Sequence, residues 1–128
     1  GARFGVNDSS SAEANIIAGT KYINRLNKMW LSSVPDSLER IKFVLASYNV
    51  GPGHVQDAQK LARKYSDNPA LWKDVGYYLL HKSEPEYYKD DVVKHGYCKG
   101  YVTYNYVQEI IERYEHYKNM LSQQQVKS

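Results

Sequence analysis

Apolar residues recur at steps of three and four along most of this chain of 128 residues, which is the spacing of an α-helix with one apolar face. One such run ends at Tyr48-Asn49 and is followed at once by Gly51-Pro52-Gly53, after which a second helical run begins. No segment alternates between apolar and polar residues for long enough to predict a sheet. The pattern therefore predicts one mostly α-helical domain over residues 1–128.

Helix start and stop signals divide the chain further. Ser10 and Glu13 have the spacing of a capping box, and Asp36 can cap a second helix with Glu39 three residues on. The expected helices cover about 12–31, 36–50, 53–65 and 102–121, with a short helical turn around Leu71, Trp72 and Val75. Short helices joined by loops are expected over 76–100, and the polar tail 122–128 is expected to fray.

The spacing of the residues argues against several kinds of functional site. The four histidines have no ligand spacing between them and the single Cys98 has no partner cysteine, so no metal site, no cofactor and no internal disulfide are expected. Cys98 is more simply a small buried residue than a nucleophile. The basic residues alternate with acidic ones along the chain, so no nucleic-acid partner is expected. No apolar run reaches the length of a membrane span.

Carboxylates are plentiful, but their spacing does not identify a general acid. Acid catalysis on a sugar needs a carboxyl whose pKa is raised by apolar surroundings. The candidates lie among charged neighbours on faces expected to be wet: Asp90, Asp91, Glu109, Glu112 and Glu115.

Several segments resemble a known family when they are compared in order. "LASYNVGPGHV" resembles the Ala-Tyr-Asn-x-Gly-Pro-Gly-x-Val segment of the lytic transglycosylases, whose catalytic domain is related in fold to goose-type lysozyme. "ARFGV" and "EANIIAGTKYINRL" resemble the family's preceding run, and "GYVTYNYVQEIIERYEHY" resembles its closing helix. "DAQKLARKYSDNPALWKDV" and "KHGYCKGY" are similar to the membrane-bound F type. The resemblance implies an all-α, lysozyme-like domain.

The resemblance also implies a substrate site. The family residues that match Tyr48 and Asn49 line a glycan cleft, and the turn at Gly51, Pro52 and Gly53 lets the backbone present them. Tyr106 matches a cleft tyrosine on the closing helix. From the residues alone, Asn49 could serve only as a helix C-cap and Tyr106 as a core contact beside Val107.

Two departures from the family pattern bear on activity. The family's catalytic Glu stands in a Glu-Ser pair before a Gly-Leu-Met-Gln segment, and this sequence contains neither. We therefore expect this chain to be the C-terminal portion of a transglycosylase domain, truncated at its N-terminal side, with no catalytic residue of its own and the acid upstream of Gly1. The isolated chain is expected to be inactive. The second departure is Val102, where the family commonly has a Glu before Thr103.

The implied reaction is non-hydrolytic cleavage of the β-1,4 bond between N-acetylmuramic acid and N-acetylglucosamine, with peptidoglycan strands as partner and no cofactor. The implied location is the periplasmic side of the bacterial cell envelope, with outer-membrane association of the full-length protein. Two alternatives stay open: a non-catalytic glycan-binding module, and recruitment of Glu13 or Glu39 as the acid. The groove left by the missing helix predicts a homo-oligomer or a partly exposed core.

Overall fold

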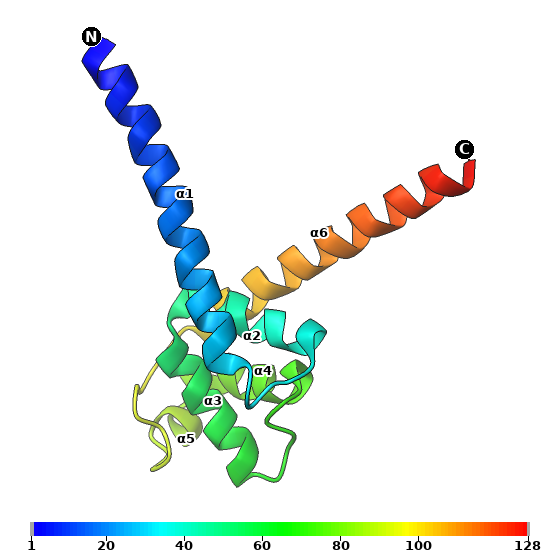
Figure 1. The fold of residues 1–128 in the computed structure, drawn as a ribbon. Helices are drawn as coiled ribbons and strands as arrows, with labels where there is room; N and C mark the ends of the chain where they lie inside the picture. Colours follow the sequence, from blue (N-terminus) through cyan, green and yellow to red (C-terminus); the bar gives the residue numbers. More distant parts are fainter. Residues whose placement is uncertain (1, 128) are drawn as a thin grey trace.

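The chain folds into an array of helices (Figure 1). The structure is a computed structural model that describes the backbone of residues 2–127 and the side chains of residues 11–124. Its helices are α1 (Ala2–Trp30), α2 (Ser37–Val50), α3 (Pro52–Lys64), α4 (Trp72–Leu80), the 3-10 helix η1 (His81–Ser83), α5 (Pro85–Tyr88) and α6 (Gly100–Lys127). Residues 2–127 contain no strand, so the predicted all-α class is confirmed.

The two longest helices project from a compact body. Helices α2 to α5 are gathered together, whereas α1 and α6 touch this body only near the C-terminal end of α1 and the N-terminal end of α6 (Figure 1). The outer parts of the two long helices diverge, and the two chain termini lie far apart (Figure 1). The body and the two inner helix ends therefore hold the core.

Three aromatic rings form the centre of that core. The ring of Phe43 lies 5.2 Å from the ring of Trp30 and 5.6 Å from the ring of Trp72, centroid to centroid. Each ring is tilted or edge-on to its neighbour, which is the arrangement that aromatic quadrupoles favour. The indole N–H of Trp30 donates to the buried hydroxyl of Ser47 at 2.9 Å. This contact fixes α1 against α2 without leaving a polar atom of Trp30 unpaired.

The apolar faces of the long helices are buried only at their inner ends. On α1, Leu26 and Trp30 are buried, but Ile16 is 68% exposed. On α6, Val107 is buried, but Tyr117 is 70% exposed. The outer turns have no packing partner in the described part of the chain, so the exposed core surface expected from the sequence is present. The expected homo-oligomer stays a prediction, which the mass of the chain in solution tests.

Several predicted helix boundaries are correct and others are wrong. The carboxylate of Asp36 accepts from the backbone N–H of Glu39 at 2.9 Å, so the predicted cap of α2 is confirmed. Helix α1 begins at Ala2 rather than near residue 12, because no proline interrupts the preceding residues. Helix α4 continues to Leu80, where only a short turn was expected. Helix α6 includes residues 122–127, and the fraying of that end stays a prediction.

The junction between α4 and α6 depends on a residue without a side chain. Gly100, the first residue of α6, is buried, and a Cβ at this position would overlap the carbonyl oxygen of Leu79. Only glycine therefore lets α6 start this close to the backbone of α4.

We predict that Gly100→Ala destabilises the chain by about 1–3 kcal/mol, because backbone atoms must move to admit the methyl group. Urea unfolding followed by circular dichroism measures the change. Gly19→Ala is the matched control, since a Cβ there meets its nearest atom, the Tyr48 hydroxyl, at an ordinary 3.8 Å. The control is expected to raise stability slightly, as alanine does within a helix. Equal stability of the two variants would contradict the prediction.

Candidate functional site

The turn between α2 and α3 is made by a single residue. Gly51 has φ +96° and ψ 143°, a conformation that residues with a side chain rarely adopt. Its backbone N–H donates to the carbonyl of Ser47 at 2.9 Å and so ends α2, while Pro52 is the first residue of α3. Gly51, and not Asn49, is thus the C-cap of α2. The alternative that Asn49 serves only as a cap is therefore wrong.

Tyr48 points from α2 toward α1. Its ring centroid lies 5.9 Å from that of Tyr22, and its hydroxyl is near Gly19. A Cβ at Gly19 would lie in ordinary contact with this hydroxyl, at 3.8 Å. Tyr48 remains 45% exposed, so the ring has one face on α1 and another toward solvent. A half-exposed aromatic ring of this kind can pack against a sugar and offer a hydroxyl at its edge.

Asn49 points from α2 toward α6. Its Oδ1 accepts a hydrogen bond from the Thr103 hydroxyl at 2.8 Å. Thr103 is 1% exposed, whereas Asn49 is exposed. A buried hydroxyl therefore holds the oxygen of an exposed carboxamide, and the N–H donors of that carboxamide are left on the side away from Thr103.

Tyr106 lies one helical turn beyond Thr103 on the same side of α6. It is half-buried and packs against the core beside the buried Val107. Of the three residues predicted from the family motif, Tyr48 and Asn49 thus lie on α2 and Tyr106 lies on α6. Asn49 joins the α6 face that carries Tyr106, and Tyr48 joins α1. Thr103 was not predicted as a site residue, because its role depends on a contact 54 positions away in sequence.

A buried polar network lies behind the turn. The Lys82 ammonium is fully buried and donates to Asp57 Oδ2 at 2.8 Å and to His54 Nδ1 at 2.6 Å. Asp57 also accepts from the backbone N–H groups of Lys94 and His95 at 2.9 and 2.8 Å. The network ties α3, η1 and the loop 89–99 together, next to the residues that present Asn49. The signal in the sequence that could have indicated this network was Asp57, a charged residue on the buried side of α3.

The pKa values of His54 and Asp57 follow from this network. Burial lowers the pKa of His54 from its ordinary 6.5, and the charge of Lys82 lowers it further. A neutral imidazole is also what the contact requires, because Nδ1 accepts from an ammonium. Burial alone would raise the pKa of Asp57, but the hydrogen bonds from Lys82, Lys94 and His95 outweigh it and the pKa is lowered.

Asp90, Glu39 and Glu13 do not have the surroundings of a general acid. Burial would raise the pKa of Asp90, but hydrogen bonds from Lys64 and the backbone of Val92 lower it to about 2. The carboxylate of Glu39 accepts from Lys42 and from the backbone of Trp72, each at 3.4 Å, and Glu13 is exposed on α1. Recruitment of Glu13 or Glu39 as an acid therefore gains no support from their contacts.

Neither a metal site nor a membrane span is found in the part of the chain that the structure describes. Its His, Cys, Asp and Glu side chains form no group of three that could hold a metal ion. None of its helices combines the length and the apolarity needed to cross a bilayer.

Comparison with known proteins agrees with the sequence resemblance. Residues 3–71 match the family model "Transglycosylase SLT domain". The chain is 43% identical over 115 residues to membrane-bound lytic murein transglycosylase F of Serratia proteamaculans. It is 40% identical over 112 residues to the protein of the same name from Yersinia enterocolitica. Each alignment covers 88% of this chain and 22% of the relative, so the chain spans about a fifth of the length of these curated relatives.

We predict that Lys82→Met destabilises the chain by about 3–5 kcal/mol, because it leaves the buried Asp57 carboxylate without its counter-ion. Denaturant unfolding gives the free energy. Lys42→Met is the matched control, since its pair with Glu39 is partly exposed and has the i,i+3 spacing of a helix surface. The control is expected to lose no more than about 1 kcal/mol. A loss from Lys82→Met no larger than that of the control would count against a structural role for the network.

We predict that stability falls as the pH is lowered from 8 toward 5, because of His54. Its folded pKa lies below the ordinary 6.5, so the unfolded chain binds the proton first and protonation favours unfolding in this window. His54→Gln should flatten the pH dependence, whereas His116→Gln, at an exposed position of α6, should keep it. Thermal melts across this pH range provide the measurement. Identical profiles for the two variants would show that another group is responsible.

Proposed function

We propose that this chain, which belongs to the transglycosylase SLT domain family, forms the glycan-contacting part of a peptidoglycan lytic transglycosylase. The family model covers more than half of the chain, and the relatives carry the name lytic murein transglycosylase. The observation that best supports the proposal is the Asn49–Thr103 hydrogen bond, because it holds an exposed carboxamide at the junction of α2 and α6. A core asparagine would have been buried.

The proposed reaction breaks the β-1,4 bond between N-acetylmuramic acid and N-acetylglucosamine. A protonated carboxyl gives its proton to the glycosidic oxygen, and an oxocarbenium-like state forms at C1. The same carboxylate then removes the proton of the muramic 6-hydroxyl, whose oxygen bonds to C1 and gives a 1,6-anhydro sugar. Water is not consumed, so the site must hold the muramic ring with its 6-hydroxyl close to C1.

The roles of the site residues follow from their positions. The N–H donors of Asn49 suit the carbonyl of an N-acetyl group or a ring hydroxyl. Tyr48 offers a half-exposed ring face beside α1, and Tyr106 supports the site from its half-buried position on α6. These residues bind and orient the glycan, and none of them supplies the acid.

We propose that the general acid comes from a segment that precedes these residues in a longer protein. Within the chain, the lowered pKa values of Asp57 and Asp90 are the reverse of what a general acid needs. The exposed apolar faces on the outer turns of α1 and α6 fit this proposal, because an added helix could cover them. The chain alone should then bind glycan without cleaving it.

We also propose that the protein works in the bacterial cell envelope, on the periplasmic side, since peptidoglycan lies there. The relatives are named as membrane-bound, and the described residues of this chain contain no membrane-spanning helix. A second candidate function, a non-catalytic glycan-binding module, is favoured by the combination of a retained Asn49 site and no suitable acid among the described residues.

The test incubates purified peptidoglycan with this chain and with a version extended upstream, and mass spectrometry detects 1,6-anhydromuropeptides. Product from the extended version alone would support the enzyme. Binding without product from either would support the glycan-binding module.

Asn49→Ala and Thr103→Val are each expected to weaken glycan binding by roughly fivefold to tenfold, the effect of one hydrogen bond. Asn105→Ala, an exposed asparagine on α6, is the matched control and should leave binding unchanged. If the unaltered chain does not bind glycan, both the transglycosylase proposal and the glycan-binding proposal are wrong.

A further inference from the structure

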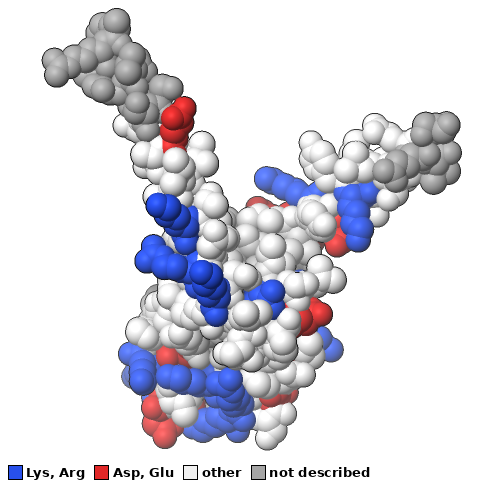
Figure 2. Space-filling model, viewed as in Figure 1, with Lys and Arg blue, Asp and Glu red and all other residues white. Residues whose placement is uncertain are grey.

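Three cationic side chains project from one side of α1. Lys21, Arg25 and Lys28 follow each other at steps of four and three residues, so they share a face of the helix, and all three are exposed. Together with Asn24 they line a shallow open pocket of about 400 Å³. Figure 2 shows blue side chains gathered on the inner part of α1, with a red side chain farther out along the same helix. We refer to these three residues as the α1 cationic stripe.

The stripe has little opposite charge near it on its own helix. Glu13 is the one acid in residues 11–30, two helical turns before Lys21. Within residues 11–124, the structure shows no salt bridge to Lys21, Arg25 or Lys28. Three exposed positive charges at neighbouring positions repel each other, and an anion bound between or above them would relieve this repulsion.

The stripe is adjacent to the proposed glycan site. The Arg25 guanidinium lies 5.6 Å from the ring centroid of Tyr22, and that ring lies 5.9 Å from the ring of Tyr48. The Tyr22 ring thus lies near both the Arg25 guanidinium and the half-exposed phenol of Tyr48. A glycan strand in contact with Tyr48 would therefore lie close to the stripe.

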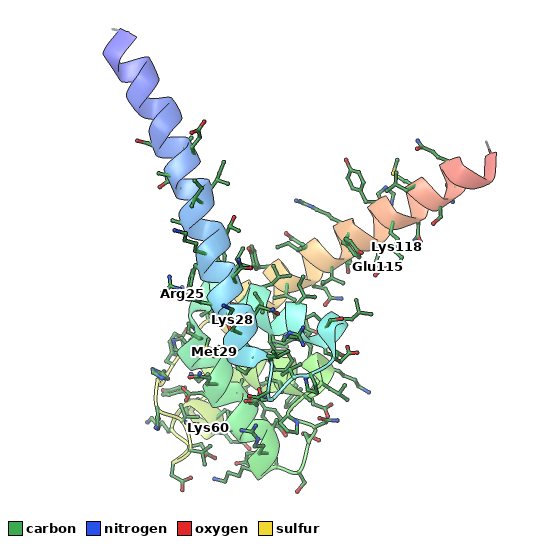
Figure 3. All side chains as sticks on the ribbon, viewed as in Figure 1. Arg25, Lys28, Met29, Lys60, Glu115 and Lys118 are labelled. Atoms are coloured by element: carbon green, nitrogen blue, oxygen red, sulfur yellow. The ribbon has the colours of Figure 1, made fainter. Side chains whose placement is uncertain are left out.

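A second basic region, on α3 and the loop 89–99, differs from the stripe. It contains Lys60, Arg63, Lys64 and Lys94, but Lys64 bonds to Asp90 at 2.8 Å and to Asp91 at 3.0 Å. Asp91 also lines the pocket that these cations share. Figure 3 shows Lys60 on α3, separated along the molecule from Arg25 and Lys28 on α1. The α3 region is thus partly neutralised within the protein, and the stripe is not.

The chemistry of the substrate supplies an anion at the required place. The N-acetyl sugars of a glycan carry no charge, but each muramic acid can carry a peptide whose free carboxylates are negative. A strand bound along Tyr48 would hold such a peptide beside α1. Guanidinium and ammonium groups pair with carboxylates through charge-assisted hydrogen bonds.

We infer that the α1 cationic stripe binds the carboxylates of the peptide stems of peptidoglycan. The inference rests on the proposed function, because it places the glycan against Tyr48. It assigns to this chain a preference for strands that carry peptides over bare glycan.

The test compares two soluble probes: peptidoglycan fragments with intact peptides, and the same strands after an amidase has removed the peptides. The triple variant Lys21→Gln, Arg25→Gln, Lys28→Gln is expected to bind the peptide-bearing probe roughly tenfold more weakly, because each exposed ion pair contributes only a small amount. Its affinity for the bare strands should not change. The preference of the unaltered chain should also shrink as salt is raised.

The matched control is Lys60→Gln, Arg63→Gln, Lys94→Gln, which removes the same number of charges from the α3 region. It should bind both probes within about twofold of the unaltered chain. All six positions are on the surface of the helices or the loop, so both triple variants should melt like the unaltered chain. Equal weakening by both triples would overturn the inference, because the effect would then be general attraction.

Two further outcomes separate this inference from the proposed function. If the unaltered chain binds bare and peptide-bearing strands equally, the stripe inference fails and the glycan site stands. If it binds neither, both fail. Vesicles of phosphatidylethanolamine with phosphatidylglycerol test the other anionic surface: loss of vesicle binding in the α1 triple, with peptidoglycan binding unchanged, would mean that the stripe contacts lipid and would overturn the inference.

Discussion

The site depends on one buried carboxylate. Asp57 accepts hydrogen bonds from Lys82 and from the backbone N–H groups of Lys94 and His95, so one side chain joins α3, η1 and the loop 89–99. A fully buried ion pair of this kind is costly to form and is tolerated only when its remaining hydrogen-bonding capacity is filled. Here backbone donors fill it. The loop that carries His95 is consequently fixed beside Gly53, where the imidazole occupies the space that a Cβ would need.

The front of the site is built from two consecutive residues that serve different helices. Tyr48 contacts α1 and Asn49 contacts α6, although both belong to the last turn of α2. The proposed glycan surface is therefore built from three helices, and its geometry would change if either long helix tilted. The family assignment suggests which ligand this surface would bind, and the α1 cationic stripe adds positive charge on one side of it.

The sequence predicted the helical class and the position of the turn because both depend on local patterns. The spacing of apolar residues and the Gly51-Pro52-Gly53 segment act within a few residues of themselves. It did not predict the partner of Asn49 or the network behind His54, and it predicted an exposed apolar surface without placing it on the outer turns of α1 and α6. These depend on which elements meet in space, and a helical pattern is the same whether or not another helix covers its face. Because cations are spread evenly along the sequence, it also gave no sign that three of them share one face of α1.

Gly51 is both the last capping residue of one helix and the residue that precedes the first turn of the next. No flexible residues therefore lie between Asn49 and His54. The carboxamide of Asn49 and the imidazole of His54 are consequently held at fixed positions on either side of one tight turn. The connection between α3 and α4, from Tyr65 to Leu71, has residues to spare and could vary in length among related chains. An insertion at Gly51 would instead rotate α2 against α3 and move Tyr48 and Asn49 away from the network behind the turn.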